Sequence, residues 1–402
     1  MAKNFFYLYL VFLLVSLVGN AAADFAILWL GTSLIKDTDL GLNIISSFYL
    51  GQAIGYIFIA PYLSSYFSQF AKRYASIVID SLYIFIYLIV LFLFYAGQLN
   101  FLAMLILSTL LAALSSVHKN SITFSLLHKI SEKIEIEKVI KSFSYVFSGT
   151  LLLGSVISGL LFQLIGFTGC ILVALATFFP MLIIYQVVFP KESLVQKTSK
   201  IKYTYFCKGF KVLKDHKNLL HSSFGTAIAY IPGAIYPGVI AVYGKEQGLS
   251  EKMISIIISL GLFVGLIFIP FIVRLFYKRA YRFSLAVAFI PTIISLLIVL
   301  MYKNTWLLGL SFAFNCIGFN ILNLISIMVR IKSVNEDEVG TLNTAYFAIM
   351  CLGQILGTII LLPLISNYPE TALFIMAICY FLSGLYMFFM CTKVATFDLV
   401  NR

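Results

Sequence analysis

Residues 51–55 read Gly51-Gln-Ala-Ile-Gly55, and residues 261–265 read Gly261-Leu-Phe-Val-Gly265. Two glycines spaced four residues apart lie on one face of a helix. Small residues at that spacing let a second helix approach closely inside a membrane. Each pair stands within an apolar run of membrane-spanning length. The sequence therefore predicts the same kind of helix contact in both halves of the chain.

Further matches between the two halves occur in the same order along the chain. They pair Pro61 with Pro270, Arg73 with Arg282, Asn120 with Asn320, and Gly154 with Gly353. One such match could be chance, but a series in one order, over matching hydropathy, indicates an internal repeat. We therefore expect an all-α membrane protein of twelve transmembrane helices, arranged as two six-helix parallel repeats.

The composition is that of a membrane protein. Hydrophobic residues make up 61% of the 402 residues and charged residues only 11%, whereas soluble domains carry about 25% charged residues. A helix needs about 20 mostly apolar residues to cross a bilayer. Twelve such runs are predicted at 5–30, 40–63, 76–96, 100–127, 143–165, 167–189, 218–243, 252–275, 281–301, 305–329, 341–365 and 369–391.

The net charge of +12 indicates a topology rather than nucleic-acid binding. Of the 28 lysines and arginines, four fall in loops on one side, Lys119 falls inside a span, and the remaining 23 fall on the side of the N-terminus. An excess of basic residues marks the cytoplasmic side. We expect a multi-pass protein of the cell membrane, as in a bacterial plasma (inner) membrane, with both termini cytoplasmic and no nucleic-acid partner.

The longest loop divides the predicted protein into three parts. We expect a six-helix bundle at 1–189, a cytoplasmic linker at 190–217 and a second six-helix bundle at 218–402. The remaining connections are short, so no sizeable soluble domain fits between the spans.

The linker itself carries eight lysines and two acidic residues. Phe206, Phe210 and Leu213 share one face of a helix by their spacing, and lysines occupy another face. This pattern predicts an interfacial helix on the anionic lipids of the cytoplasmic leaflet. A solvated linker that only follows the charge rule is the alternative.

The N-terminal run has the look of a cleavable signal peptide, because Lys3 precedes an apolar stretch that contains Ala21-Ala22-Ala23. Hydrophobicity continues past these alanines as far as Leu30. We therefore expect an uncleaved first transmembrane helix.

The sequence contains no motif for catalysis. It has no P-loop, which excludes a self-contained ATP-driven pump. Its six cysteines have neither metal-site nor disulfide spacing. The protein is expected not to be an enzyme and to need no metal or other cofactor.

With this layout the chain resembles transporters of the major facilitator superfamily, in which the substrate binds midway between the two repeats. The segment from Pro61 to Arg73 stands where that family has Gly-x-x-x-Asp-Arg-x-Gly-Arg-Lys between helices 2 and 3. Ser64 and Ser68 occupy the expected Gly and Asp positions, so only the basic end of the motif is present. The resemblance implies gating-loop residues at Lys72, Arg73, Arg274 and Arg282.

Other stretches are similar to exporters of this superfamily. Gly154-Ser-Val-Ile-Ser-Gly159 looks like the Gly-Pro-x-x-Gly-Gly pattern associated with antiport, with Ser155 in place of Pro. Val334-Asn-Glu-Asp-Glu-Val-Gly340 is similar to the acidic loop before helix 11 in the macrolide-efflux and enterobactin-exporter branch. His118 stands where several macrolide-efflux-like proteins have a histidine in helix 4. Ordinary close packing is the alternative interpretation of the first motif.

Ionisable residues within a span cost about 2.5–3.5 kcal/mol to insert, so they need a partner or a function. Asp24 lies one turn beyond Asn20 on the same face of span 1, which suits a proton or cationic-substrate site; a structural pairing is the alternative. His118 and Lys119 in span 4 are candidates for modulating that protonation. Asp80, in span 3, is expected to be structural and to pair with Lys119 or the basic loop.

The second half offers amides instead of charges. Asn320 and Asn323 share a face of span 10, and Asn343 and Gln354 nearly share a face of span 11. We expect them to bind polar groups of a substrate, or alternatively to join helices through hydrogen bonds. Helix packing is expected at Gly51, Gly55, Gly154, Gly159, Gly261, Gly265, Gly353 and Gly357.

Together these features predict a proton-coupled exporter of small amphipathic or natural-product-like molecules, such as drugs or siderophores, that works by alternating access. Its partners would be the small-molecule substrate, protons or another coupling ion, and anionic lipids at the cytoplasmic face. We expect a monomer. Two alternatives stay open: an importer of a metabolite or peptide, and a lipid flippase or non-transporting receptor on the same fold.

The charge distribution makes a prediction about topology. Reporter tags at residue 2 and after Arg402 should both report the cytoplasm, because the basic residues gather on that side. A compartment-sensitive pair of reporters fused at each end measures this. A periplasmic signal from either end, or cleavage after Ala23, contradicts the twelve-span topology.

Overall fold

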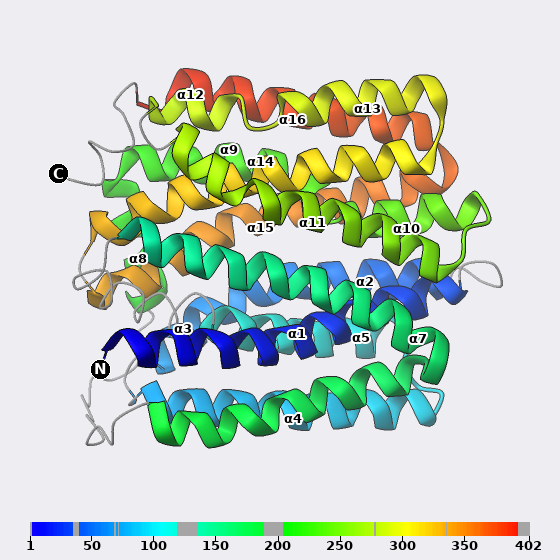
Figure 1. Ribbon diagram of the computed structural model, residues 1–402, viewed down its shortest axis with the longest axis horizontal. Helices are drawn as coiled ribbons and strands as arrows, with labels where there is room; N and C mark the ends of the chain where they lie inside the picture. Colours follow the sequence, from blue (N-terminus) through cyan, green and yellow to red (C-terminus); the bar gives the residue numbers. More distant parts are fainter. Residues whose placement is uncertain are drawn as a thin grey trace.

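The computed structural model of the protein describes residues 2–34, 40–67, 70, 72–118, 136–188, 204–276, 279–334 and 336–392. These residues fold into a bundle of long helices that run roughly side by side (Figure 1). The start of α1 and the end of α16 lie at the same end of the bundle, here called the terminal end. The opposite end is called the far end.

The described residues of the first half form seven helical elements. They are α1 (Ala2–Leu34), α2 (Leu40–Ile54), the π-helix η1 (Gly55–Ile59), α3 (Ala60–Phe67), α4 (Lys72–Tyr95), α5 (Phe101–Ser116) and α7 (Ile136–Val188). Because α2, η1 and α3 are continuous, they make one crossing. The helix α7 is broken at Gly166, whose positive φ of 69° is a conformation that glycine adopts readily. The chain reverses there, so α7 crosses twice.

In the second half, the part of the chain that the structure describes forms nine helices. They are α8 (Thr204–Asp215), α9 (Lys217–Gly233), α10 (Tyr236–Glu246), α11 (Glu251–Phe276), α12 (Tyr281–Ala286), α13 (Ile290–Tyr302), α14 (Thr305–Ser333), α15 (Glu336–Asn367) and α16 (Pro369–Met390). Prolines at the starts of α10 and α13 divide two crossings into paired pieces, because proline fits the first helical turn but not the helix interior.

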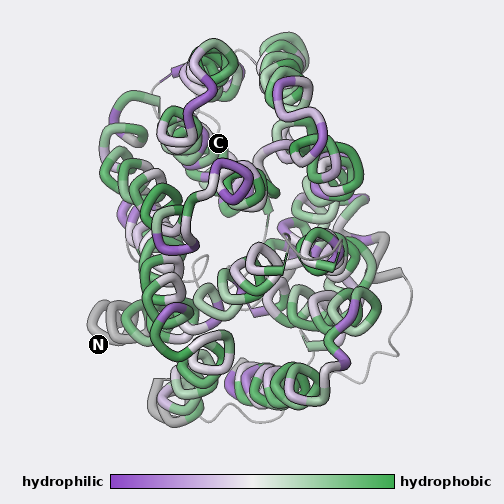
Figure 2. Tube along the Cα trace, turned by 90° about the vertical axis from the view of Figure 1, so that its right-hand side faces the viewer, coloured by the Kyte–Doolittle hydropathy of each residue, from purple (hydrophilic) through white to green (hydrophobic). Residues whose placement is uncertain are grey.

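Ten helical segments among the described residues are long and apolar enough to cross a membrane. One of them, Lys141–Leu182, contains the reversal at Gly166 and accounts for two crossings. The shorter apolar helix α5 supplies a further crossing. The twelve predicted spans are therefore confirmed. Viewed along the helix axes, hydrophobic residues predominate along the helices of the bundle (Figure 2).

The fourth helix of each half begins in the same way at the far end. Asn100 precedes α5 and accepts a hydrogen bond from the backbone of Ala103 at 3.0 Å. Asn304 precedes α14 and accepts one from the backbone of Trp306 at 2.7 Å. An asparagine in this position satisfies an N–H that the helix leaves without a partner. In both halves, an asparagine thus caps the N-terminus of the fourth helix.

The paired glycines also make equivalent contacts in the two halves. A Cβ atom at Gly51 or Gly55 would clash with α5. A Cβ atom at Gly261 or Gly265 would clash with α14. In each half the second crossing therefore packs closely on the fourth, as the repeat predicts.

The fifth crossing of each half packs closely on the first. Gly154 of α7 lies against Ala21 of α1, and Gly353 and Gly357 of α15 lie against the backbone of α9. Gly159 is different, because its neighbour is Ser255 of α11 in the other half. This glycine allows close contact between the two halves, not within one.

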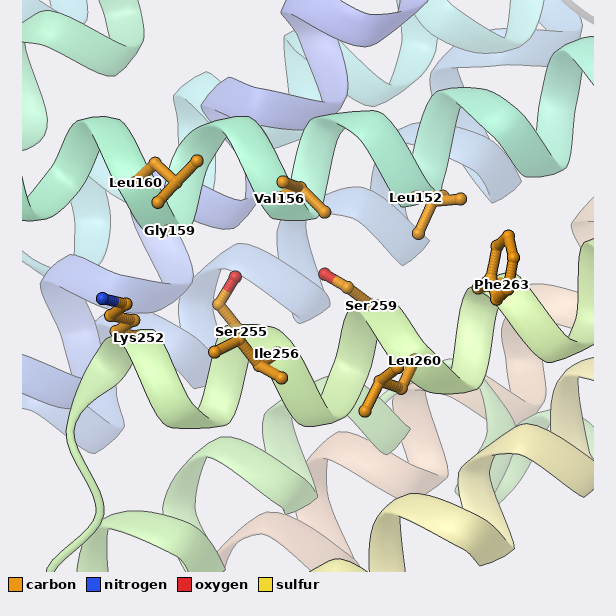
Figure 3. A pocket seen from close by; sticks show the side chains of 10 residues that line it. All are labelled: Leu152, Val156, Gly159, Leu160, Lys252, Ser255, Ile256, Ser259, Leu260 and Phe263. Atoms are coloured by element: carbon orange, nitrogen blue, oxygen red, sulfur yellow. The ribbon is translucent and has the colours of Figure 1, made fainter.

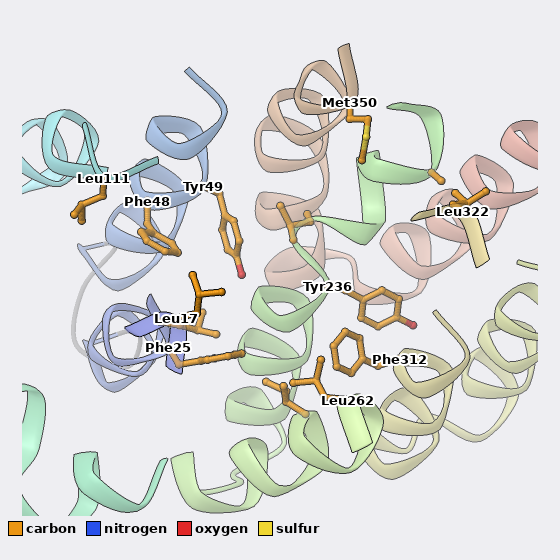
Figure 4. Close-up of a cluster of buried hydrophobic side chains, with 14 of the residues drawn as sticks. Leu17, Phe25, Phe48, Tyr49, Leu111, Tyr236, Leu262, Phe312, Leu322 and Met350 are labelled. Atoms are coloured by element: carbon orange, nitrogen blue, oxygen red, sulfur yellow. The ribbon is translucent and has the colours of Figure 1, made fainter. Parts of the chain in front are cut away.

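One buried apolar cluster continues through both halves of the protein. Figure 4 shows Phe25, Phe48 and Tyr49 of the first half facing Tyr236 and Phe312 of the second. A Cβ atom at Gly238 of α10 would lie 2.9 Å from the ring of Tyr49. The halves thus touch through side chains near the far end.

The helix α8 lies within the predicted linker and packs on the protein. Gly209 lies against the backbone of Thr341, and Leu213 is fully buried. Lys208 forms an ion pair with Glu338 of α15 at 3.4 Å. At least part of the apolar face expected to meet lipid is therefore covered by protein. Phe206 lies outside the described side chains, and the lipid contact stays a prediction.

The glycine contacts predict a selective effect of substitution. In Gly357→Ala, the new methyl group would overlap the carbonyl of Ile231, so the helices must separate at a cost of about 1–3 kcal/mol. Gly154→Leu, facing Ala21, should have a similar effect. Thermal unfolding in detergent and folded yield measure both.

Gly149→Ala is the matched control, because the nearest atom to its new Cβ lies 3.9 Å away, in Leu14. This change should leave stability equal or slightly higher, since alanine favours helix by about 1 kcal/mol over glycine. Equal stability for Gly357→Ala and Gly149→Ala would show that α15 and α9 are not held together at this glycine.

Candidate functional site: a cavity between the two halves

A cavity of about 190 Å³ lies between the two halves of the bundle. Its walls come from α2, η1 and α7 of the first half and from α9, α14 and α15 of the second. Aromatic rings, amides and hydroxyls alternate on its surface, and no charged side chain lines it among the described residues. The lining residues are Gln52, Tyr56, Phe143, Ser144, Phe147, Ser148, Tyr230, Ala234, Asn320, Asn323, Ile327, Phe347 and Gln354.

The π-helix η1 brings Tyr56 to this cavity. Single-turn π-helices are rare and are often found at functional sites. Gly55 opens the turn and lies against the backbone of Thr109 in α5. The ring of Tyr56 lies 6.0 Å from the ring of Phe347 in α15. One wall of the cavity is therefore an aromatic pair that joins the two halves.

Gln354 links the halves through hydrogen bonds. Its side-chain nitrogen donates to the backbone carbonyl of Tyr49 at 2.9 Å and to the side-chain oxygen of Gln52 at 3.4 Å. Gln354 is almost fully buried, so these bonds satisfy a polar group that would be costly to leave without partners. The predicted substrate ligand Gln354 thus lies at the cavity and also joins α15 to α2.

The two asparagines of α14 have different surroundings. Asn320 donates to the carbonyl of Gly265 at 3.0 Å, and Ser148 of α7 donates to the side-chain oxygen of Asn320 at 3.4 Å. Asn323 lines the same cavity and makes no hydrogen bond to another described side chain or backbone group. Asn320 is held by the protein, whereas the amide of Asn323 is available to a ligand.

A second polar group lies inside the first half, around a cavity of about 10 Å³, roughly the space of one water molecule. Asn20, Asp80, Tyr83 and His118 line it. Asn20 accepts a hydrogen bond from the hydroxyl of Tyr87 at 2.5 Å. Asp80 and His118 are both buried. The structure therefore gathers α1, α4, α7 and the residues at the end of α5 and just after it around one small polar space.

Asp24 lies one turn beyond Asn20 on α1 and is partly buried. Its carboxylate is close enough to interact electrostatically with the hydroxyls of Tyr49, Tyr56 and Tyr87. These tyrosines come from α2, η1 and α4, so the carboxylate faces the interior of the first half, not lipid. Tyr56 in turn lines the central cavity, so Asp24 lies within electrostatic range of one residue of that cavity.

Asn343 is the predicted site residue that the structure places elsewhere. It is fully buried and does not line the central cavity. Its side-chain oxygen accepts a hydrogen bond from Arg330. Arg330 also donates to the carbonyl of Ser326 at 3.3 Å and lies 4.0 Å from the ring centroid of Tyr346. The amide of Asn343 thus stabilises a buried cation.

Arg330 also corrects the expectation that ionisable groups gather in the first half. The predicted span 305–329 ended one residue before it, whereas α14 continues to Ser333. Its guanidinium is 1% exposed. A buried arginine needs partners that share its charge, and the tyrosine ring and the amide provide them.

The predicted gating residues are only partly described. Arg73 lies at the start of α4 and is partly buried, and Arg274 near the end of α11 is exposed. Arg282 lies 4.8 Å from the ring centroid of Phe388 in α16. The side chain of Lys72 lies outside the described residues, as do Lys119 and Asn120. A gating role for this group stays a prediction.

Sequence reasoning missed the aromatic lining of the central cavity. Aromatic residues make up 16% of the chain, so no local pattern separates rings that face a cavity from rings that face lipid. From the sequence, only the amides and the titratable groups could be identified as candidate site residues, because such groups are rare within apolar helices.

The comparisons with known proteins agree with this geometry. The Major Facilitator Superfamily profile matches residues 4–358, and the chain belongs to this family. It is therefore a multi-pass membrane transporter and not an enzyme. A comparison with curated proteins finds no match.

Several solved structures share the fold over nearly the whole chain. A bacterial homologue of the iron transporter ferroportin, in its outward-facing state, aligns with a TM-score of 0.70 and 18% identity, over 99% of this chain and 100% of that chain. The human organic anion transporter MFSD10 aligns with a TM-score of 0.67 and 10% identity, over 96% and 99%. The nucleoside transporter NupG aligns with a TM-score of 0.61 and 15% identity, over 99% and 98%.

The two asparagines of α14 give a paired prediction. Asn320→Ala should lower the free energy of unfolding by about 1 kcal/mol, because it removes the bonds to Gly265 and Ser148. Asn323→Ala should change it by less than about 0.5 kcal/mol, because that amide has no bond to lose. Reversible unfolding in mixed micelles measures both, and an equal loss of stability contradicts the distinction.

Proposed function

We propose that the protein is a proton-coupled exporter of small amphipathic cations, which it binds in the cavity between its halves and moves by alternating access. The observation that carries the proposal is the lining of that cavity, which combines aromatic faces and amides from both halves. In transporters built from two repeats, the substrate binds between the repeats, midway along the transport route. A cavity lined by both halves is at that place.

The lining favours a substrate with a ring or cationic centre and a few polar groups. Aromatic faces attract cations and stack on planar rings. The amide of Asn323 supplies a donor and an acceptor that have no hydrogen-bond partner among the described residues. A cavity of about 190 Å³ is below the roughly 300–1,000 Å³ of drug-sized pockets, which favours a small molecule.

The proposed coupling group is Asp24. Its carboxylate interacts with Tyr49 and Tyr56, and Tyr56 lines the substrate cavity. A negative carboxylate attracts a cationic substrate, and a neutral carboxyl does not. Protonation from the acidic side would therefore release the cation, and loss of the proton would restore binding. His118, at the small polar cavity, would modulate this exchange.

The proposed export of the substrate rests on the likeness of the α7 segment from Gly154 to Gly159 to a pattern of exporters. The contacts of this segment also bear on coupling. Gly154 brings α7 against α1, the helix that carries Asp24, and Gly159 brings the same helix against α11 of the other half. A change at α1 can thus reach the contact between the halves through one rigid helix. This arrangement supports coupling between protonation and rocking of the halves.

Transport in proteoliposomes tests the proposed function. With an imposed proton gradient, a fluorescent lipophilic cation should accumulate in the more acidic compartment, and Asn323→Ala should weaken its apparent affinity. Accumulation of a neutral metabolite instead, without the cation, supports the importer. Ligand binding without flux of any compound supports a receptor. Either of the last two results overturns the proposal.

Substitution of Asp24 tests the coupling step. Asp24→Asn keeps the size and hydrogen bonding of the side chain but removes its titration. It should abolish accumulation against a gradient and leave expression and downhill exchange intact. Flux with and without the proton gradient measures the two activities separately.

Asp80→Asn is the matched control, because Asp80 is a buried acid of the same half. We expect this change to lower thermal stability, as suits a structural residue, while the folded fraction still transports uphill. Normal uphill transport by Asp24→Asn would exclude Asp24 as the coupling site and make His118 the next candidate.

A further inference from the structure

A groove of about 290 Å³ lies on the outside of the bundle, between α7 and α11. Figure 3 shows Leu152, Val156 and Leu160 on one side and Ile256 and Leu260 on the other. Most of these apolar side chains are substantially exposed. In a membrane transporter such exposed apolar groups at the middle of long spans face lipid, so the groove is open to the bilayer.

The floor of the groove is a contact between the two halves. Ser155 and Ser259 form a hydrogen bond of 2.7 Å, and the hydroxyl of Ser255 donates to the carbonyl of Ser155 at 2.8 Å. Gly159 leaves room for the side chain of Ser255. Whatever occupies the groove therefore lies along the line at which α7 and α11 meet.

One end of the groove carries a lysine. Lys252, at the start of α11, extends beside the groove at the far end of the bundle (Figure 3). Two other described lysines at this end have acidic partners: Lys245 pairs with Glu251, and Lys303 pairs with Glu370. Lys252 has no acidic partner among the described residues. Its charge is therefore available to an anion that lies at the mouth of the groove.

The length of the groove matches one leaflet of a membrane. Lys252 and Phe263 both line it, and the rise of α11 from the first to the second, eleven residues further on, is about 16 Å. The hydrocarbon core of a bilayer is about 30 Å thick, so one leaflet accounts for half of it. A positive charge at one end and about 15 Å of apolar surface below it fit a phosphate headgroup with an attached acyl chain.

We propose that an anionic phospholipid of the far-end leaflet binds in this groove, with its phosphate at Lys252 and one acyl chain along α7 and α11. The lipid lies against both halves of the transporter. It therefore stabilises the arrangement in which α7 and α11 meet at Ser155 and Ser259.

Native mass spectrometry of the purified full chain tests the site, with phosphatidylglycerol titrated against phosphatidylcholine. The wild-type protein should retain one phosphatidylglycerol molecule in preference to phosphatidylcholine. Lys252→Gln should weaken its binding about fivefold, the effect of one basic residue at an anionic lipid surface. Lys303→Gln, which removes another exposed lysine at the same end that does not line the groove, should leave the binding unchanged.

A second pair of variants tests the acyl-chain position. Leu260→Trp should fill the groove and reduce lipid retention, whereas Leu164→Trp alters a highly exposed residue of α7 that does not line it. A phosphatidylglycerol with a photoreactive acyl chain should label peptides 152–160 and 256–263 in the wild-type protein and not in Leu260→Trp.

Three results overturn the proposal. If the wild-type protein and Lys252→Gln bind phosphatidylglycerol equally, Lys252 does not contact the lipid headgroup. If inorganic phosphate displaces phosphatidylglycerol when both are at the same concentration, the site binds a free anion and not a lipid. A wild-type dimer that Leu260→Trp dissociates shows that a second copy of the chain covers the groove.

Discussion

Close approach of helix backbones at small residues is the constraint on which the rest of the structure depends. In a membrane the backbone must satisfy its own hydrogen bonds, so the chain forms helices, and apolar side chains gain little by leaving lipid for another helix. Packing must then hold the bundle together. The glycines at 51 and 55, with their counterparts at 261 and 265, bring the second crossing of each half onto the fourth, and Gly357 brings the fifth onto the first.

Amides inside this bundle differ in whether they bond to a neighbouring helix or face the central cavity. Gln354 bonds to α2, and Asn343 stabilises Arg330. Burial makes such bonds necessary, since a buried polar group without a partner costs about 1–3 kcal/mol. Asn323 is the contrasting case, because it faces the central cavity instead of a neighbouring helix. In the proposed function, an amide that packing does not use is the one available to a substrate.

The helix α7 lines two different spaces along its length. The central cavity is lined by Phe143, Ser144, Phe147 and Ser148, and the groove that is open to lipid is lined by Leu152, Val156, Gly159 and Leu160. Within the second stretch, Ser155 contacts α11. A movement that opens one space must therefore alter the other, because a helix transmits displacement as a stiff rod. Lipid in the groove and substrate in the cavity would thus act on the same contact between the halves.

The sequence by itself determined the number of spans, the repeat and the close-packing glycines, because hydropathy and small-residue spacing are local properties that the membrane enforces at each helix. It also identified Asn320, Asn323 and Gln354 as polar groups within spans. Only the tertiary structure decided their roles, since the rotation of each helix sets which neighbour an amide meets. For the same reason Arg330 looked like a loop residue until α14 extended past it and Tyr346 packed against its charge.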